Sequence, residues 1–242
     1  MYLPCTGSQI KCVRKLPQHG IVCQPLFASS TLFLQMSPVP EEAPMVADSE
    51  RFQAAIARFD AANAEDPTTE VFQGAVYPKE LLYAQRMTAW LDKLAPDASE
   101  ALRLAVRCQH IQRWAIPRHT YPMDRTGYLR WRTTLAKFHA DTATAILRDV
   151  GYDDAIIRRV QRLLRKESLK RDPEVQCLED VICLVFLENY LAAFATQHDE
   201  AKILDILQKT WKKMSSRGHE VALTLSMSPE ARRLVAQALA TP

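Results

Sequence analysis

The sequence predicts an all-α protein, with a single helical domain of about eight helices over residues 46–242. Apolar residues recur at helical spacing through almost all of the chain after residue 48. Helix start signals, in which Ser or Asp precedes a proline or an acid, recur between these stretches. No stretch alternates apolar and polar residues with a period of two, and no Asn-Gly or Asp-Gly hairpin signal occurs, so we expect few strands.

Residues 1–45 are predicted to be an irregular N-terminal extension, either disordered or wrongly assigned to the protein. Residues 1–40 contain no Asp or Glu and hold three of the six cysteines, unlike the rest of the chain. Two interpretations remain: a mitochondrial presequence, or sequence upstream of a start at Met36 or Met45. No apolar run approaches 18 residues, so we expect no membrane span. Cys108, Cys177 and Cys183 have no CxxC spacing and are typical of reduced thiols, so we expect an intracellular protein, in the cytoplasm or in mitochondria.

The predicted helices follow their start and stop signals in chain order. The first half of the domain is predicted to hold helices that begin at Ser49, at Pro78, at Ser99 and at Tyr128, the third continuing to about Trp114 and the fourth ending at Gly151. In the second half, the predicted helices begin at Asp153 or Asp154, at Asp172, at Asp199 and at Ser228. The helix after Asp172-Pro173-Glu174 is apolar nearly all round, so we expect it to be central.

Charge is distributed unevenly along the chain, although the whole sequence carries only +3. Residues 41–100 have twelve acids against five bases, whereas residues 103–137 have eight bases against one acid. Residues 158–171 add seven bases against one acid. Two interpretations remain open: a basic surface that attracts anionic ligands, or acidic and basic helices that pair with each other.

Four polar residues stand on stretches that are otherwise apolar. Glu179 and Asp180 precede a long apolar run, where a carboxylate needs a partner or a metal ion. His110 continues the line of Leu102 and Val106, and His139 lies on the inward line of its own helix. Because imidazole and carboxylate suit a divalent metal, we expect His110, His139 and Asp180 to converge as metal ligands, with Glu179 orienting a ligand or acting as a base. The alternative is a set of satisfied core residues.

The sequence resembles an uncharacterised family of helical domains, some of whose members carry a glutamyl-tRNA synthetase label. The resemblance spans roughly residues 50–228 and rests on several spaced motifs, at residues 82–88, 107–118, 121–122, 127–132, 138–140 and 178–181.

The order of these parts is also distantly similar to the HD phosphohydrolase superfamily, in which histidines and aspartates hold a metal. Tyr83 stands near the place of the first His of that superfamily, and Gln109-His110 takes the place of its His-Asp pair. Asp180 keeps its type. The resemblance implies a metal-dependent phosphohydrolase, with Glu179 and Asp180 as catalytic residues.

Arginines alternate with aromatic residues between residues 113 and 132. Guanidinium groups bind phosphate in two-pronged contacts and aromatic faces stack on bases, so this segment predicts a nucleotide, a phosphorylated small molecule or RNA as ligand. The candidate phosphate-binding residues are Arg113, Arg118, Arg130, Arg132 and Lys166. The alternative function is a non-catalytic module that binds RNA, tRNA or a protein, with His110 and Asp180 as a structural pair.

The segment Lys213-Met214-Ser215-Ser216-Arg217 looks like the KMSKS loop of class I aminoacyl-tRNA synthetases. Synthetase activity is not expected, because the chain has neither the HxGH-like signature nor glycines for a nucleotide-binding sheet. We expect this segment to end a helix, with Gly218 as its left-handed stop.

Overall fold

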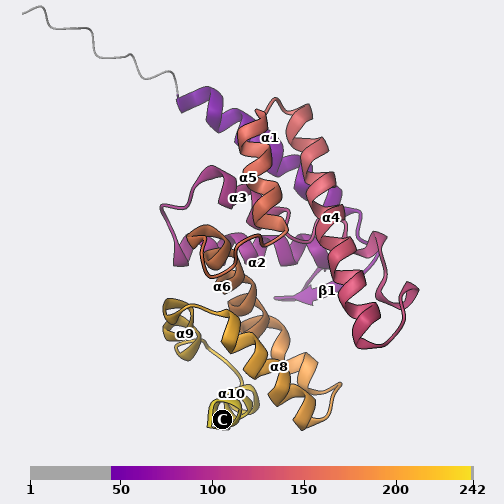
Figure 1. Ribbon diagram of the computed structural model, residues 1–242, viewed down its shortest axis with the longest axis vertical. Helices are drawn as coiled ribbons and strands as arrows, with labels where there is room; N and C mark the ends of the chain where they lie inside the picture. Colours follow the sequence, from indigo (N-terminus) through magenta and orange to yellow (C-terminus); the bar gives the residue numbers. More distant parts are fainter. Residues whose placement is uncertain (1–44, 241–242) are drawn as a thin grey trace, which may run out of the picture. The chain divides into compact units, whose positions relative to one another are not determined.

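Residues 45–240 are described by the computed structural model, with side chains from residue 50 onward (Figure 1). Over this range the chain forms a mostly helical domain with ten α-helices and one small β-hairpin. The extension predicted over residues 1–45 falls outside the described residues except for Met45, where the first helix begins. No helix in the described range is long and apolar enough to cross a bilayer.

The helices alternate with short connections. In chain order they are α1 (Met45–Ala64), α2 (Lys79–Leu94), α3 (Glu100–Arg107), α4 (Arg125–Asp149), α5 (Asp154–Leu164), α6 (Pro173–Val185), α7 (Leu191–Ala195), α8 (Glu200–Lys213), α9 (Ser216–Leu223) and α10 (Pro229–Ala240). Two short 3₁₀ turns, Arg113–Ala115 and Arg118–Thr120, lie between α3 and α4. A π-helical turn, Phe186–Tyr190, joins α6 to α7.

Local capping explains why most helices begin and end where the sequence predicts. Asp153, Asp172 and Asp199 each accept hydrogen bonds from the first free backbone N–H groups of α5, α6 and α8. Gly151 ends α4 with a left-handed φ of 85°. Two starts differ from the prediction. Helix α1 begins at Met45, with Ser49 inside it, and α4 begins at Arg125 after its cap Asp124, three residues before Tyr128.

A β-hairpin, which the sequence reading did not predict, follows α1. Strands β1 (Thr69–Phe72) and β2 (Ala75–Pro78) pair antiparallel, with Val71 opposite Val76. The two-residue loop between them has φ of 52° at Gln73 and 80° at Gly74. Both angles are positive, as a tight hairpin turn requires, so Gln-Gly does here what Asn-Gly usually does.

Helix α3 ends well before the predicted Trp114. It stops at Arg107, and Gln112 adopts a left-handed φ of 49° while its N–H donates to Asn63 Oδ1 of α1 at 3.0 Å. His110 therefore lies in the turns beyond the helix and not one helical turn after Val106. This contact with α1 is long-range, and the helical spacing of α3 carries no sign of it.

Helix α6 packs against the largest number of partners, including α2, α3, α5, α8 and α9. Its residues Val175, Leu178, Val181 and Leu184 are fully buried. In Figure 1, α1, α4 and α5 lie on one side of α2 and α6, and α8, α9 and α10 lie on the other. The predicted central position of α6 is confirmed. Helices of both flanking groups contact it.

Candidate functional site

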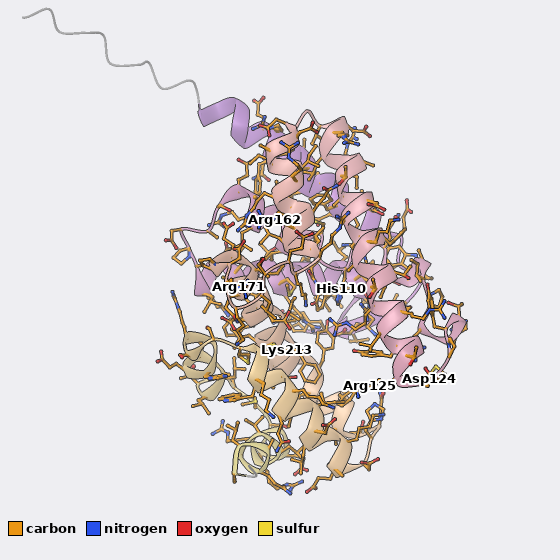
Figure 2. All side chains as sticks on the ribbon, viewed as in Figure 1. His110, Asp124, Arg125, Arg162, Arg171 and Lys213 are labelled. Carbon is orange, nitrogen blue, oxygen red and sulfur yellow. The ribbon has the colours of Figure 1, made fainter. Side chains whose placement is uncertain are left out.

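A pocket of about 490 Å³ opens between α2, the turns after α3, the start of α4, α6 with its π-helical turn, and α8. Five cationic residues line it: Lys79, Arg113, Arg132, Lys166 and Lys213. Six aromatic residues line it as well: Tyr83, Tyr128, Trp131, Phe186, Tyr190 and Phe194. Figure 2 labels two of the lining residues, His110, which precedes α6 in the chain, and Lys213, which follows it.

His110 stands at the inner wall of this pocket. Its Nδ1 lies 3.3 Å from Glu80 Oε2, and its Nε2 lies 3.4 Å from Arg113 Nη1. Its ring stacks on Tyr83, with centroids 4.1 Å apart. Burial, together with the nearby charge of Arg113, holds the pKa of His110 well below its usual value, so the ring is neutral. Nε2 then accepts from Arg113, and Nδ1 carries its hydrogen on the side of Glu80.

Glu80 is the second residue of α2 and is 8% exposed. Burial raises its pKa above the usual value, although Arg113 and Lys79 act in the opposite direction. The sequence reading did not single out Glu80, because an acid in the first turn of a helix is common there for the helix dipole alone. The only available signal was its place two residues after Pro78, on a helix whose next turn carries Tyr83.

Glu179 of α6 points toward the pocket and pairs with two lysines. Lys166 Nζ lies 2.6 Å from Oε2, and Lys213 Nζ lies 3.8 Å from Oε1. Burial would raise the pKa of Glu179, but the charge and hydrogen bond of Lys166 outweigh it and the pKa is lowered. The Glu179 carboxylate is therefore ionised at neutral pH, and it holds both lysine side chains at the pocket wall.

Asp180, the next residue, faces a different neighbour. It accepts hydrogen bonds from Ser215 N at 2.8 Å, Ser215 Oγ at 2.5 Å and Gln176 Nε2 at 3.1 Å. Ser215 in turn caps α9, its Oγ accepting from Gly218 N at 3.0 Å. Asp180 thus anchors the start of α9 and does not line the pocket.

Gly218 does not end α8 as a left-handed stop, which corrects the prediction. It lies inside α9, and Ser215 begins that helix as its cap. A Cβ at position 218 would lie 2.7 Å from Asp180 Oδ1, so glycine is needed for this close approach. The KMSKS-like segment is the connection between α8 and α9, and its backbone binds Asp180.

The expected metal ligands do not come together. His110 and His139 are neighbours, with ring centroids 6.0 Å apart, whereas Asp180 hydrogen-bonds to Ser215. Within the part of the chain that the structure describes, no three His, Cys, Asp or Glu side chains are placed to hold one metal ion. The residues present therefore do not fit a metal centre of the HD kind.

The candidate phosphate-binding residues divide into two groups. Arg113, Arg132 and Lys166 line the pocket together. Arg118 instead donates to the backbone carbonyls of Tyr121 and Asp124. Arg130 is exposed and lies outside the pocket, although it is only two residues before Arg132 on α4.

The sequence reading also missed the aromatic wall on the far side of the pocket, formed by Phe186, Tyr190 and Phe194. The first two lie at the ends of the π-helical turn, whose extra residue rotates the chain after α6. Arg86 holds this turn in place, donating to Tyr190 Oη at 2.8 Å and to Glu70 Oε1 of the hairpin at 2.6 Å. A π-helical turn inside an apolar helix leaves no sequence signal that spacing rules detect.

A family model described as Domain of unknown function (DUF4202) matches residues 53–235. The chain belongs to this family. No curated protein and no solved structure matches the chain. The resemblance to an uncharacterised helical family is therefore confirmed, and DUF4202 membership assigns no reaction. All the residues that line the pocket lie within the DUF4202 match.

Proposed function

We propose that the pocket binds a nucleotide or a nucleotide-like phosphate ester. The observation that supports this is the combination of charge and aromatic surface in one cavity. Five cations and two carboxylates line it, and with His110 neutral this leaves three positive charges unmatched. A ligand that supplies two or three negative charges and a flat aromatic group complements such a wall.

Arg132 is the residue best suited to hold the phosphate. It is exposed on α4, lines the pocket and has no carboxylate partner among the described residues. Its guanidinium lies over the Tyr128 ring, 5.9 Å from the centroid. Lys166 and Lys213, in contrast, already share Glu179. Arg113 Nε lies 3.9 Å from Glu80 Oε1, so an incoming phosphate meets one unpaired guanidinium and three partly neutralised cations.

Aromatic rings on two sides supply surfaces on which a base stacks. Trp131 lies against Arg113, which is 4.7 Å from its ring centroid, and its Nε1 donates to Ile116 O at 2.8 Å, so its orientation is fixed. Tyr190 stands across the pocket, held by Arg86. Rings held by hydrogen bonds lose little side-chain entropy when a ligand binds.

Isothermal titration calorimetry with AMP, ADP, adenosine and inorganic phosphate tests the proposal. We expect AMP and ADP to bind more tightly than adenosine or phosphate alone, because only they engage both the cations and the rings. Arg132→Gln should weaken AMP binding about 10- to 100-fold, the cost of one charge-assisted hydrogen bond. Arg130→Gln is the matched control, since it removes the same charge from the same helix outside the pocket.

Equal loss of AMP affinity in the two variants would contradict a specific pocket and indicate a diffuse basic surface. The same conclusion would follow if a single-stranded RNA bound tightly in low salt, with unchanged affinity in Arg132→Gln, while AMP did not bind.

A further inference from the structure

A second pocket of about 620 Å³ lies behind the first, between α4 and the end of α5. The two pockets share a wall formed by Gln109, His110, Arg113, Arg132 and Lys166. Leu129, Leu135 and Leu164 give the second pocket an apolar side, and among the described residues the two histidines are the only aromatic side chains that line it. It therefore offers no stacking surface like that of the first pocket.

The second pocket is strongly basic. Arg113, Arg132, Lys137, Arg165 and Lys166 contribute cations, and no Asp or Glu is among the described residues that line it. Arg165 reaches Asp141 only at 3.7 Å, with both side chains more than a third exposed. A pair of that kind contributes little, so the Arg165 guanidinium is available to an anion.

Two of the residues that line this pocket each carry a buried hydrogen-bond acceptor without a partner. Gln109 is 7% exposed and its Oε1 has no hydrogen-bond donor. His139 is 4% exposed; its Nδ1 lies 2.8 Å from Ile111 O, to which it must donate. Its Nε2 then carries a lone pair, and this atom also has no partner. Because burial lowers the pKa of His139 to about 3, the lone pair stays free of a proton at neutral pH.

Buried acceptors without donors are rare in folded proteins, since each leaves a desolvation cost uncompensated. Inorganic phosphate would neutralise the cations of this pocket, but it has few hydrogen-bond donors for the two buried acceptors. A ligand with both a phosphate and several hydroxyl groups satisfies the cations and the two acceptors together. We propose that the second pocket binds a sugar phosphate, with its hydroxyl groups donating to Gln109 Oε1 and His139 Nε2. This site does not require that the first pocket bind a nucleotide.

Ribose 5-phosphate is the probe, titrated by calorimetry beside inorganic phosphate and ribose. We expect ribose 5-phosphate to bind at least about 10-fold more tightly than phosphate, from two additional neutral hydrogen bonds. His139→Asn keeps a donor for Ile111 O and removes the Nε2 acceptor, so it should weaken ribose 5-phosphate about 3- to 10-fold and leave phosphate unchanged. Gln109→Met is a second variant of similar volume that breaks no hydrogen bond within the protein.

Two further variants separate the pockets. Arg165 lines the second pocket and not the first, whereas Lys79 lines the first and not the second, and both are at the surface. Arg165→Gln should weaken ribose 5-phosphate and leave AMP unchanged, and Lys79→Gln should do the reverse. Ribose 5-phosphate binding no more tightly than phosphate would overturn the proposal, as would unchanged affinity in both His139→Asn and Gln109→Met. Either result leaves the AMP experiment to decide the first pocket on its own.

Discussion

Glu179 and Asp180 are adjacent carboxylates on the same buried helix, yet they face different neighbours. Successive residues of an α-helix point about 100° apart. Glu179 therefore faces the lysines of the pocket, while Asp180 faces the backbone at the start of α9. One carboxylate positions charges for a ligand, and the other holds two helices together.

The two faces are connected through the segment between α8 and α9. Lys213 pairs with Glu179, and Ser215, two residues later, binds Asp180. Lys170 adds a hydrogen bond from Nζ to Met214 O at 2.9 Å. The KMSKS-like segment is thus held by both carboxylates of α6 and by Lys170. We expect substitutions at Glu179 and at Asp180 to differ in their effects on stability and on AMP affinity.

The largest effect is expected from Lys166→Met. Removing this ammonium leaves Glu179, which is 3% exposed, with only Lys213 at 3.8 Å. An uncompensated buried charge should lower the free energy of unfolding by about 3 kcal/mol. Urea unfolding measures it, and the double variant Lys166→Met/Glu179→Gln should recover most of the loss. No recovery would mean that the lysine acts by packing and not by charge.

Asp180→Ala should come next, with a loss of about 2 kcal/mol in unfolding free energy. It leaves Ser215 N and Oγ without their acceptor and removes one of the two hydrogen bonds of Gln176 Nε2, which still donates to Lys213 O. Because Asp180 is outside the pocket, AMP affinity of the folded protein should stay within about twofold of wild type. A tenfold loss of AMP affinity with normal stability would reverse the roles assigned to the two carboxylates.

Gly218→Ala tests the contact between Asp180 and α9 by a change in α9. Alanine normally stabilises a helix interior by about 1 kcal/mol relative to glycine. Here the new Cβ meets Asp180 Oδ1 at 2.7 Å, so we expect a net loss of about 1–2 kcal/mol. Ser216→Ala, at an exposed position of the same helix, is the control and should change stability little. A stabilised Gly218→Ala protein would show that α9 is not held closely against α6.

Apart from these substitutions, the wild-type protein should show a pH dependence of stability that comes from the pocket side. Burial lowers the pKa values of His110 and His139 in the folded state, the latter to about 3 from 6.5. Below pH 6.5 the unfolded chain binds protons that the folded one does not, so stability is complete above that pH and falls as the pH decreases toward the folded pKa values.

The slope should approach about 1.4 kcal/mol per pH unit for each of the two histidines. His139→Asn should remove one of these protons, which urea unfolding at several pH values between about 4 and 7 measures. An unchanged slope in this variant would indicate that His139 is protonated in the folded state.

Charge patterning in the sequence left two interpretations open, and each applies to part of the molecule. Arg107 and Arg103 pair with Asp60 and Asp92 of the acidic segment, as the pairing interpretation predicted. Arg132 stays without a carboxylate among the described residues, as the anion-binding interpretation predicted. Sequence spacing alone does not separate the two, because pairing depends on which helices pack together.

Particular residues show where local rules ended. The spacing of His110 from Val106 predicts a helical position, but α3 ends at Arg107, and Gln112 beyond it contacts Asn63 of α1. The shared apolar stretch of Glu179 and Asp180 predicts that Asp180 lies beside the histidines. Asp180 instead points about 100° away from Glu179 around the helix and binds Ser215. The spacing of residues in the sequence did not predict the role of Glu80 or the aromatic wall at the π-helical turn.

The sequence by itself determined the mostly helical class, most helix boundaries and the central place of α6, because capping, proline and apolar periodicity act within a few residues of each other. Only the tertiary structure decided which carboxylate faces the pocket, which arginines are left unpaired and why position 218 is glycine. Those depend on contacts between segments far apart in the chain, where the direction of a side chain is set by the packing of its whole helix.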